Sequence, residues 1–177
     1  MKGFFKQRKG FSLVELLIAL LIMAIIAGTA ITLFGGVLET SRGGADRETA
    51  DAIKRAILTY VNAANDPDLS TLGVTDGASS QNLVDELAKT IRISGAGTTG
   101  ATVTSQSSSA AAPSPIAGAT AADKEIDGTY GPFLEKEDIK PEQNGMVGWA
   151  ININTLTQVI TVTSTDEAAD AVITITP

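Results

Sequence analysis

Apolar and polar residues follow three different patterns along this chain: a continuous apolar run, spacings of three and four, and alternation. Each pattern predicts a different element. Residues 11–34 are almost continuously apolar and contain one charged residue, Glu15. About 24 residues at a rise of 1.5 Å make a helix of roughly 36 Å, which is long enough to cross a hydrocarbon core about 30 Å thick. We therefore predict that residues 11–36 form a membrane-spanning helix.

The same helix is predicted to continue as an amphipathic half over residues 37–66, because apolar residues there recur at spacings of three and four. The predicted buried face consists of Ile53, Ala56, Ile57, Tyr60, Val61 and Ala64. The helix should end near Asn65-Asp66-Pro67. Glycine costs a helix about 1 kcal/mol relative to alanine, so we predict bending at five glycines. These are Gly28, Gly35, Gly36, Gly43 and Gly44.

The remaining residues, 67–177, are predicted to form a globular head. An apolar stripe predicts a second helix over residues 80–93, with Ser79 or Ser80 as its cap. From residue 147 the period changes to two, which predicts an antiparallel sheet of about three strands within residues 147–176. Its predicted core residues are Trp149, Ile151, Ile160, Val162, Ile173 and Ile175. A long helix packed on such a sheet is an α+β fold.

Residues 94–122 separate these parts of the head and contain no charged or aromatic residue. Ser, Thr, Ala, Gly and Pro dominate the segment, and only Val103 and Ile116 are bulky, so we do not expect it to bury a core. A surface loop or a hairpin insertion is one interpretation, and an O-glycosylated patch is the alternative. An intact mass would distinguish them.

Charge and composition exclude several classes of function. The chain has 13 basic and 20 acidic residues, no histidine and no cysteine. An acidic surface argues against nucleic-acid binding. Without histidine or cysteine the commonest catalytic base and the strongest nucleophile are missing, so we predict that the chain is not an enzyme, although carboxylate catalysis stays open. No disulfide can form.

Residues Lys9-Gly10-Phe11-Ser12-Leu13-Val14-Glu15-Leu16 resemble the class III leader and start of a type IV prepilin or type II secretion pseudopilin. The resemblance implies that a prepilin peptidase removes residues 1–10 as a leader after Gly10 and methylates the new amino terminus on Phe11. It also implies that the carboxylate of Glu15 pairs with the amino terminus of a neighbouring subunit. It suggests the pilin-like form of the α+β fold. Many pilins of Gram-negative bacteria close a C-terminal loop with a disulfide, and this chain departs from that pattern.

The function that this resemblance implies is structural. The chain would be a pilin, a homo-oligomeric subunit assembled into a type IV pilus by a platform protein and an ATPase, for adhesion, twitching motility or DNA uptake. A pseudopilin of a secretion or competence system is the alternative. Before assembly the precursor would span the cytoplasmic membrane with its basic leader inside, as the positive-inside rule predicts, and afterwards it would lie in a cell-surface filament.

Two simpler interpretations of the N-terminus stay open. Lys2, Lys6, Arg8 and Lys9 before an apolar run are also typical of a secretory signal peptide, with Gly28-Thr29-Ala30 as its cleavage site. A plain signal anchor would instead hold a binding domain that never polymerises. Neither alternative explains Glu15, because a charge inside a membrane span costs about 3 kcal/mol and normally has a function.

An acidic cluster in the head is a candidate calcium site and otherwise a solvated loop. Asp123, Glu125 and Asp127 alternate before Gly128, which is how a calcium loop begins. The match is incomplete because Leu134 stands where the closing glutamate belongs. No other cofactor is predicted.

Overall fold

The computed structural model describes residues 10–94, 102–107, 112–119 and 127–177. The chain divides into two units, residues 1–41 and 42–177, and each is described by itself. Helix α1 (Leu13–Ala64) contributes residues to both units. The prediction of one long helix is therefore confirmed, and the helix continues through all five glycines named above.

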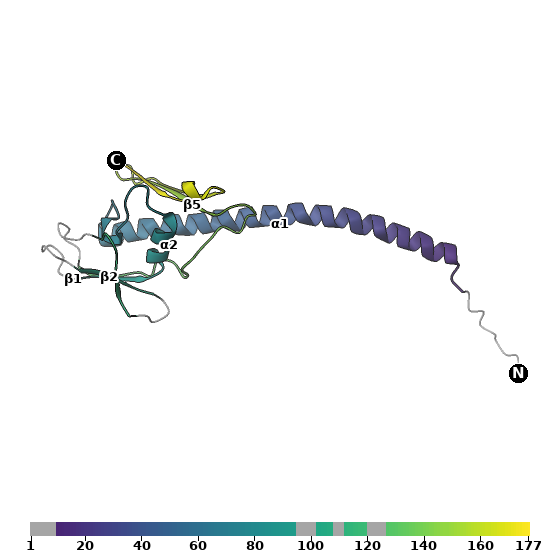
Figure 1. Cartoon of the computed structure of the whole chain (residues 1–177), viewed down its shortest axis with the longest axis horizontal. Helices are drawn as coiled ribbons and strands as arrows, with labels where there is room; N and C mark the ends of the chain where they lie inside the picture. The colour runs from purple at the N-terminus through teal and green to yellow at the C-terminus, as the bar shows by residue number, and fades with distance from the viewer. Residues whose placement is uncertain (1–9, 95–101, 108–111, 120–126) are drawn as a thin grey trace, which may run out of the picture. The chain divides into compact units, whose positions relative to one another are not determined.

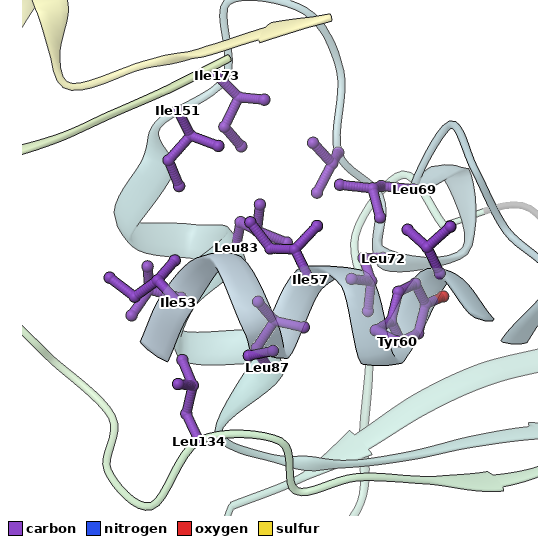
Figure 2. Close-up of a cluster of buried hydrophobic side chains, with 14 of the residues drawn as sticks. Ile53, Ile57, Tyr60, Leu69, Leu72, Leu83, Leu87, Leu134, Ile151 and Ile173 are labelled. Atoms are coloured by element: carbon purple, nitrogen blue, oxygen red, sulfur yellow. The ribbon is translucent and has the colours of Figure 1, made fainter. Parts of the chain in front are cut away.

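Helix α1 is drawn as one continuous ribbon in Figure 1, and within residues 42–177 it buries one face at helical spacing (Figure 2). The buried residues of α1 are Asp46, Ala50, Ile53, Ala56, Ile57, Tyr60, Val61 and Ala64. All six predicted apolar positions are among them. The helix ends where predicted, since Asn65 adopts a left-handed backbone with φ 51°, a conformation that asparagine tolerates at the end of a helix.

The end of α1 is tied to the next segment by a buried carboxylate. Asp66 is fully buried and accepts hydrogen bonds from the Tyr60 hydroxyl at 3.0 Å and the Thr71 backbone N–H at 2.9 Å. Thr71 belongs to a short 3-10 helix, η1 (Ser70–Leu72). A buried carboxylate is tolerated because donors satisfy it. The Tyr60 ring also packs edge-on against Phe133, with ring centroids 5.8 Å apart.

The second helix, α2 (Ser80–Leu87), is shorter than predicted. Residues predicted to continue it form strand β1 (Thr90–Ser94), in which Ile91 and Ile93 are both buried. The prediction of a helix over 80–93 was therefore wrong after Leu87. The reason is that Ile91 and Ile93 alternate with polar residues, and β-branched residues at period two suit a strand.

A four-stranded antiparallel sheet that the sequence did not predict has the order β3-β2-β1-β4. Its other strands are β2 (Thr102–Gln106), β3 (Ser114–Pro115) and β4 (Gly128–Tyr130). Val103 and Ser105 of β2 are buried, so the expectation that residues 94–122 bury no core was wrong at these positions. Pairing of β2 with β1 supports the hairpin interpretation of the segment.

The C-terminal sheet has three strands, as predicted, in the order β6-β5-β7. Strands β5 (Gly148–Asn154) and β6 (Ile160–Thr165) pair antiparallel, whereas β7 (Ile173–Thr176) pairs parallel to β5. The prediction of a wholly antiparallel sheet was wrong for β7. A short 3-10 helix, η2 (Ala168–Asp170), connects β6 to β7, which lies on the far side of β5 and also bonds to residues 76–80.

Residues from both helices and the C-terminal sheet share one core (Figure 2). Trp149, Ile151, Ile160 and Ile173 are buried as predicted, while Val162 and Ile175 are partly buried against the same cluster. The indole N–H of Trp149 donates to the Ile139 carbonyl at 2.9 Å, so this large side chain is buried with its polar atom satisfied. The α+β architecture is thereby confirmed.

Candidate processing and assembly site

The Gly10–Phe11 peptide bond lies in an exposed segment that precedes α1. Gly10, Phe11 and Ser12 are outside the helix, and Phe11 is 84% exposed. A Cβ added to Gly10 would meet no heavy atom within 4 Å. The peptide bond at which cleavage was predicted is therefore neither helical nor covered by the described residues, which is the condition that a peptidase requires of its substrate.

Glu15 lies in the first turn of α1. The backbone N–H groups of Glu15 and Leu16 donate to the Ser12 carbonyl at 3.0 and 3.2 Å, which begins the helix two residues after Phe11. Unpaired N–H groups give a helix N-terminus a partial positive charge, so a carboxylate in this turn is favourable. An amino terminus created on Phe11 would lie close in sequence to this carboxylate.

The apolar half of α1 exposes large side chains on every side. Its most apolar stretch is long enough to cross a membrane by length and composition, and none of it is buried within the chain. The exposed large residues of this half include Leu13, Leu17, Ile22, Met23, Ile26, Leu33, Phe34 and Leu38. A surface of this kind needs lipid or another protein to cover it.

Polar groups within this apolar half are satisfied by the helix itself. The hydroxyls of Thr29 and Thr32 donate to backbone carbonyls one turn earlier, at 3.0 Å for Thr29 to Ile26 and 2.9 Å for Thr32 to Thr29. Such bonds remove the need for water at these side chains. Glu15 is the one charged residue between Phe11 and Leu38, and the helix offers its side chain no such carbonyl partner because a carboxylate donates no hydrogen bond.

Four of the five glycines predicted as bending points have open surroundings. A Cβ at Gly28, Gly35, Gly36 or Gly44 would contact nothing within 4 Å, and at Gly43 it would meet the Gln143 side chain at an ordinary 3.6 Å. None of the five is therefore required for close packing within the chain. Their role as bending points stays a prediction.

The calcium prediction falls mostly outside the described residues. Asp123 and Glu125 lie there, and Asp127 is exposed next to β4. Within the described ranges no group of three or more acidic side chains is arranged to hold a metal ion. The calcium site stays a prediction.

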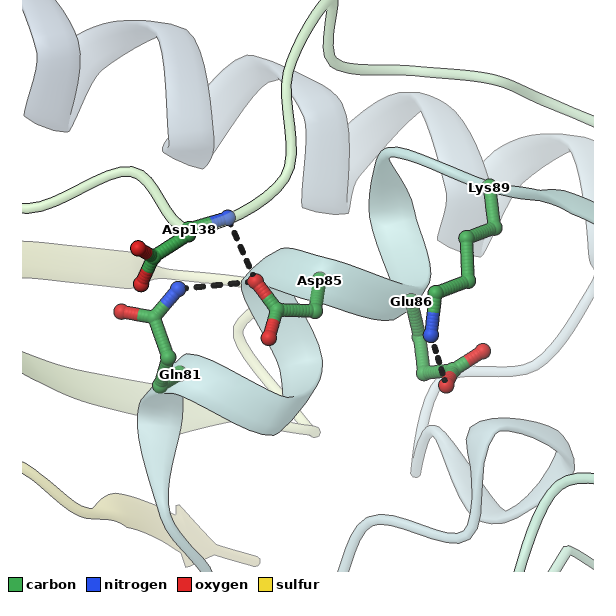
Figure 3. A network of polar contacts seen from close by, with 5 residues as sticks. All are labelled: Gln81, Asp85, Glu86, Lys89 and Asp138. Carbon is green, nitrogen blue, oxygen red and sulfur yellow. Dashed lines mark hydrogen bonds and ion pairs between the residues drawn. The ribbon is translucent and has the colours of Figure 1, made fainter. Parts of the chain in front are cut away.

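Sequence reasoning missed a segment, residues 132–146, that we call the strap. Its backbone is held by carboxylates of both helices. Asp85 of α2 accepts from the Asp138 N–H at 2.8 Å, and from the Gln81 side chain as Figure 3 shows. Asp46 of α1 is 4% exposed and accepts from the N–H groups of Glu142 and Gln143 at 2.6 and 3.1 Å.

An open groove of about 800 Å³ separates the strap from α1. Its lining mixes acidic residues such as Glu48 and Glu142 with the basic residues Arg55, Lys136 and Lys140. The pKa of Lys140 is raised by its hydrogen bond to the neighbouring Asp138. The signal for the strap in the sequence was Asp46, an acidic residue at a position that continues the buried face of the helix.

Comparison with known proteins identifies the N-terminal segment. A family model described as the prokaryotic N-terminal methylation motif matches residues 5–31. This motif is the class III prepilin signal of type IV pilins and pseudopilins. Comparisons with curated proteins and with solved structures found no match.

The motif and the fold together support one class of precursor. The motif covers the start of a long helix whose first half is apolar and exposed, and an α+β head with a C-terminal sheet follows. The motif supports a type IV pilin-like or pseudopilin precursor. An apolar N-terminal helix behind such a signal is consistent with membrane anchoring before assembly.

Proposed function

We propose that this chain is the structural subunit of a type IV pilus, cleaved after Gly10, methylated on Phe11 and assembled through the apolar half of α1. The observation that carries the proposal is the methylation motif at residues 5–31, with Glu15 as the one charge inside the apolar stretch that it begins. The role is structural rather than catalytic, which agrees with the absence of histidine and cysteine.

Assembly transfers an apolar helix from lipid to other helices. Because lipid tails are as apolar as leucine, the transfer itself selects no particular arrangement of subunits. The pairing of Glu15 with the Phe11 ammonium of a neighbour supplies that selection. Either charge alone is costly in an apolar core, so only the register that pairs them is stable. The partners in this process are a prepilin peptidase, a platform protein and an ATPase.

The first test is the N-terminal sequence and intact mass of the chain isolated from its own cells. Processing as proposed leaves an N-methylated Phe11 and 177 − 10 = 167 residues. A chain that begins at Met1, or at Ile31 after a signal-peptidase cut, would contradict the proposal. Electron microscopy of the material sheared from the same cells then checks whether the processed chain forms fibres.

A further inference from the structure

The hairpin of β5 and β6 combines an uncharged sequence with exposed large apolar side chains, although the chain as a whole is acidic. Four of the 13 basic residues lie in the leader, so the processed chain carries 9 basic and 20 acidic residues, a balance of −11. Residues 143–165 nevertheless contain no charged residue. Among the described residues after α1, the exposed large apolar side chains are Val147, Leu156 and Val159, and all three flank these two strands.

The free edge of this sheet is β6. Strand β7 ends the sheet on the other side, but its edge is covered: Ile173 exchanges hydrogen bonds of 2.8 Å with Gly77 and Ala78. Within the described residues, β6 has a hydrogen-bonded strand on one side only. Charged residues and prolines commonly protect an edge strand from pairing with another chain. The sequence of β6, Ile160-Thr-Val-Thr-Ser-Thr165, contains neither.

We propose that the edge of β6, together with Leu156 and Val159 at the hairpin turn, contacts the head of a second copy of this chain. The electrostatic balance favours this occupant. Copies with a charge of −11 repel one another at most approaches, whereas an uncharged edge meets a neighbour without repulsion and without burying a charge. Leu156 and Val159 are 81% and 59% exposed and gain from being covered.

The second copy also offers a complementary surface. The other sheet ends in β3 and β4. Pro115 protects the edge of β3, whereas β4 has one hydrogen-bonded strand neighbour among the described residues and contains neither a charge nor a proline. A contact between different surfaces of identical chains repeats from copy to copy and forms an open helical array. The inference rests on the proposed function, since assembly of α1 brings the heads together.

Photo-crosslinking of the full-length chain in its own cells tests the contact directly. Because the chain has no cysteine, Thr163→Cys on β6 accepts a benzophenone maleimide at one site. Thr174→Cys on β7 is the matched control, since Thr174 is also an exposed threonine of this sheet but belongs to the strand with the covered edge. We expect several-fold more crosslinking to peptides of the same chain from position 163. Equal crosslinking, or crosslinking from position 163 only to another protein, would overturn the inference.

Two variants that each introduce a negative charge give a second test, in which the yield of fibres is measured. Thr163→Glu should lower the yield of sedimentable fibres about tenfold, because it places a negative charge against an acidic neighbour, while Thr174→Glu should change it less than twofold. Fluorescence of Trp149, the single tryptophan, checks that both heads fold. If fibres form but position 163 gives no self-crosslink, the contact at β6 is wrong and the proposed function stands. If self-crosslinks form without fibres, the proposed function is wrong and the contact stands.

Discussion

The two halves of α1 have similar local structure and opposite relations to the rest of the chain. Between Leu13 and Leu38 the large apolar side chains are exposed all round, whereas between Ala50 and Ala64 most apolar side chains lie on one buried face. Ile22 is 52% exposed and Ile57 is completely buried, although both are isoleucines of the same helix. The comparison teaches that only the second half is stabilised by packing within the chain. The first half needs an environment supplied by lipid or by another protein.

Removing the charge of Glu15 should have the largest effect of the changes considered. It should impair assembly through the apolar half of α1 and leave the head unaffected. In the proposed filament, Glu15→Ala leaves the partner ammonium unpaired in an apolar core, at a cost of about 3–5 kcal/mol, so fibre yield should fall by roughly two to three and a half orders of magnitude. Fibre yield is measured by shearing and sedimentation. Membrane insertion and the melting temperature of the head should not change.

Glu15→Gln separates charge from shape, because it keeps the size and the hydrogen-bonding oxygen of the side chain. It should assemble as poorly as Glu15→Ala. Normal fibres from either variant would contradict the proposed charge pairing. A lower melting temperature of the head would show that the apolar half of α1 also contributes to the stability of the head.

Truncation of a buried isoleucine should affect the second half alone. Ile57→Ala removes a fully buried side chain and should lower the free energy of unfolding by about 2–5 kcal/mol. Ile22→Ala is the matched control in the exposed half and should change it by less than about 0.5 kcal/mol. Denaturant unfolding of the detergent-solubilised chain, followed by Trp149 fluorescence, measures both. Equal losses would show that the two halves share one folded unit.

The buried end of α1 should make stability fall at high pH. Burial raises the pKa of the Tyr60 hydroxyl above its ordinary value, so the folded state favours the protonated phenol. This contribution is complete below the unfolded pKa, about 10, and is lost as the pH rises above it. Tyr60→Phe should cost about 1 kcal/mol at pH 7 through the lost bond to Asp66, and should flatten the decline above pH 10. Melting curves between pH 7 and 11 test this, and an unchanged decline in Tyr60→Phe would assign it to other groups.

Replacement of helix glycines should give the smallest effect. Alanine fits at Gly35 and Gly36, where a Cβ meets nothing within 4 Å, and each change should favour the helix by about 1 kcal/mol. If assembly requires this part of α1 to bend, the double variant should assemble more slowly while the head melts at the same temperature. Unchanged assembly kinetics would remove the glycines from the list of bending points.

The elements that the sequence predicted correctly are those whose cause is local. The helix over the apolar stretch, the buried face from Ile53 to Ala64, and the strands around Trp149 and Ile160 each follow from a pattern within a few turns or residues. The candidate cleavage and assembly residues, Gly10, Phe11 and Glu15, also stand within one short motif, and their roles stay predictions.

The errors arise where distant segments decide the structure. Strand β1 forms because residues 90–94 pair with β2 and β4, and the short alternation at Ile91 and Ile93 does not decide by itself between a strand and the end of a helix. The position of β7 beside β5 depends on bonds to residues 76–80, nearly a hundred positions earlier. The strap depends on Asp46 and Asp85, whose partners are backbone N–H groups that carry no sequence signal.

The placement of β7 has a mechanical consequence. This strand lies between β5 and residues 76–80, and it is bonded to β5 through the carbonyls of Val172 and Thr176 and to the other side through Ile173 and Ile175. Tension along β7 therefore loads bonds on both of its sides together, in shear, instead of unzipping them one after another. In a chain without cysteine, this geometry fastens the C-terminus against pulling without a covalent link.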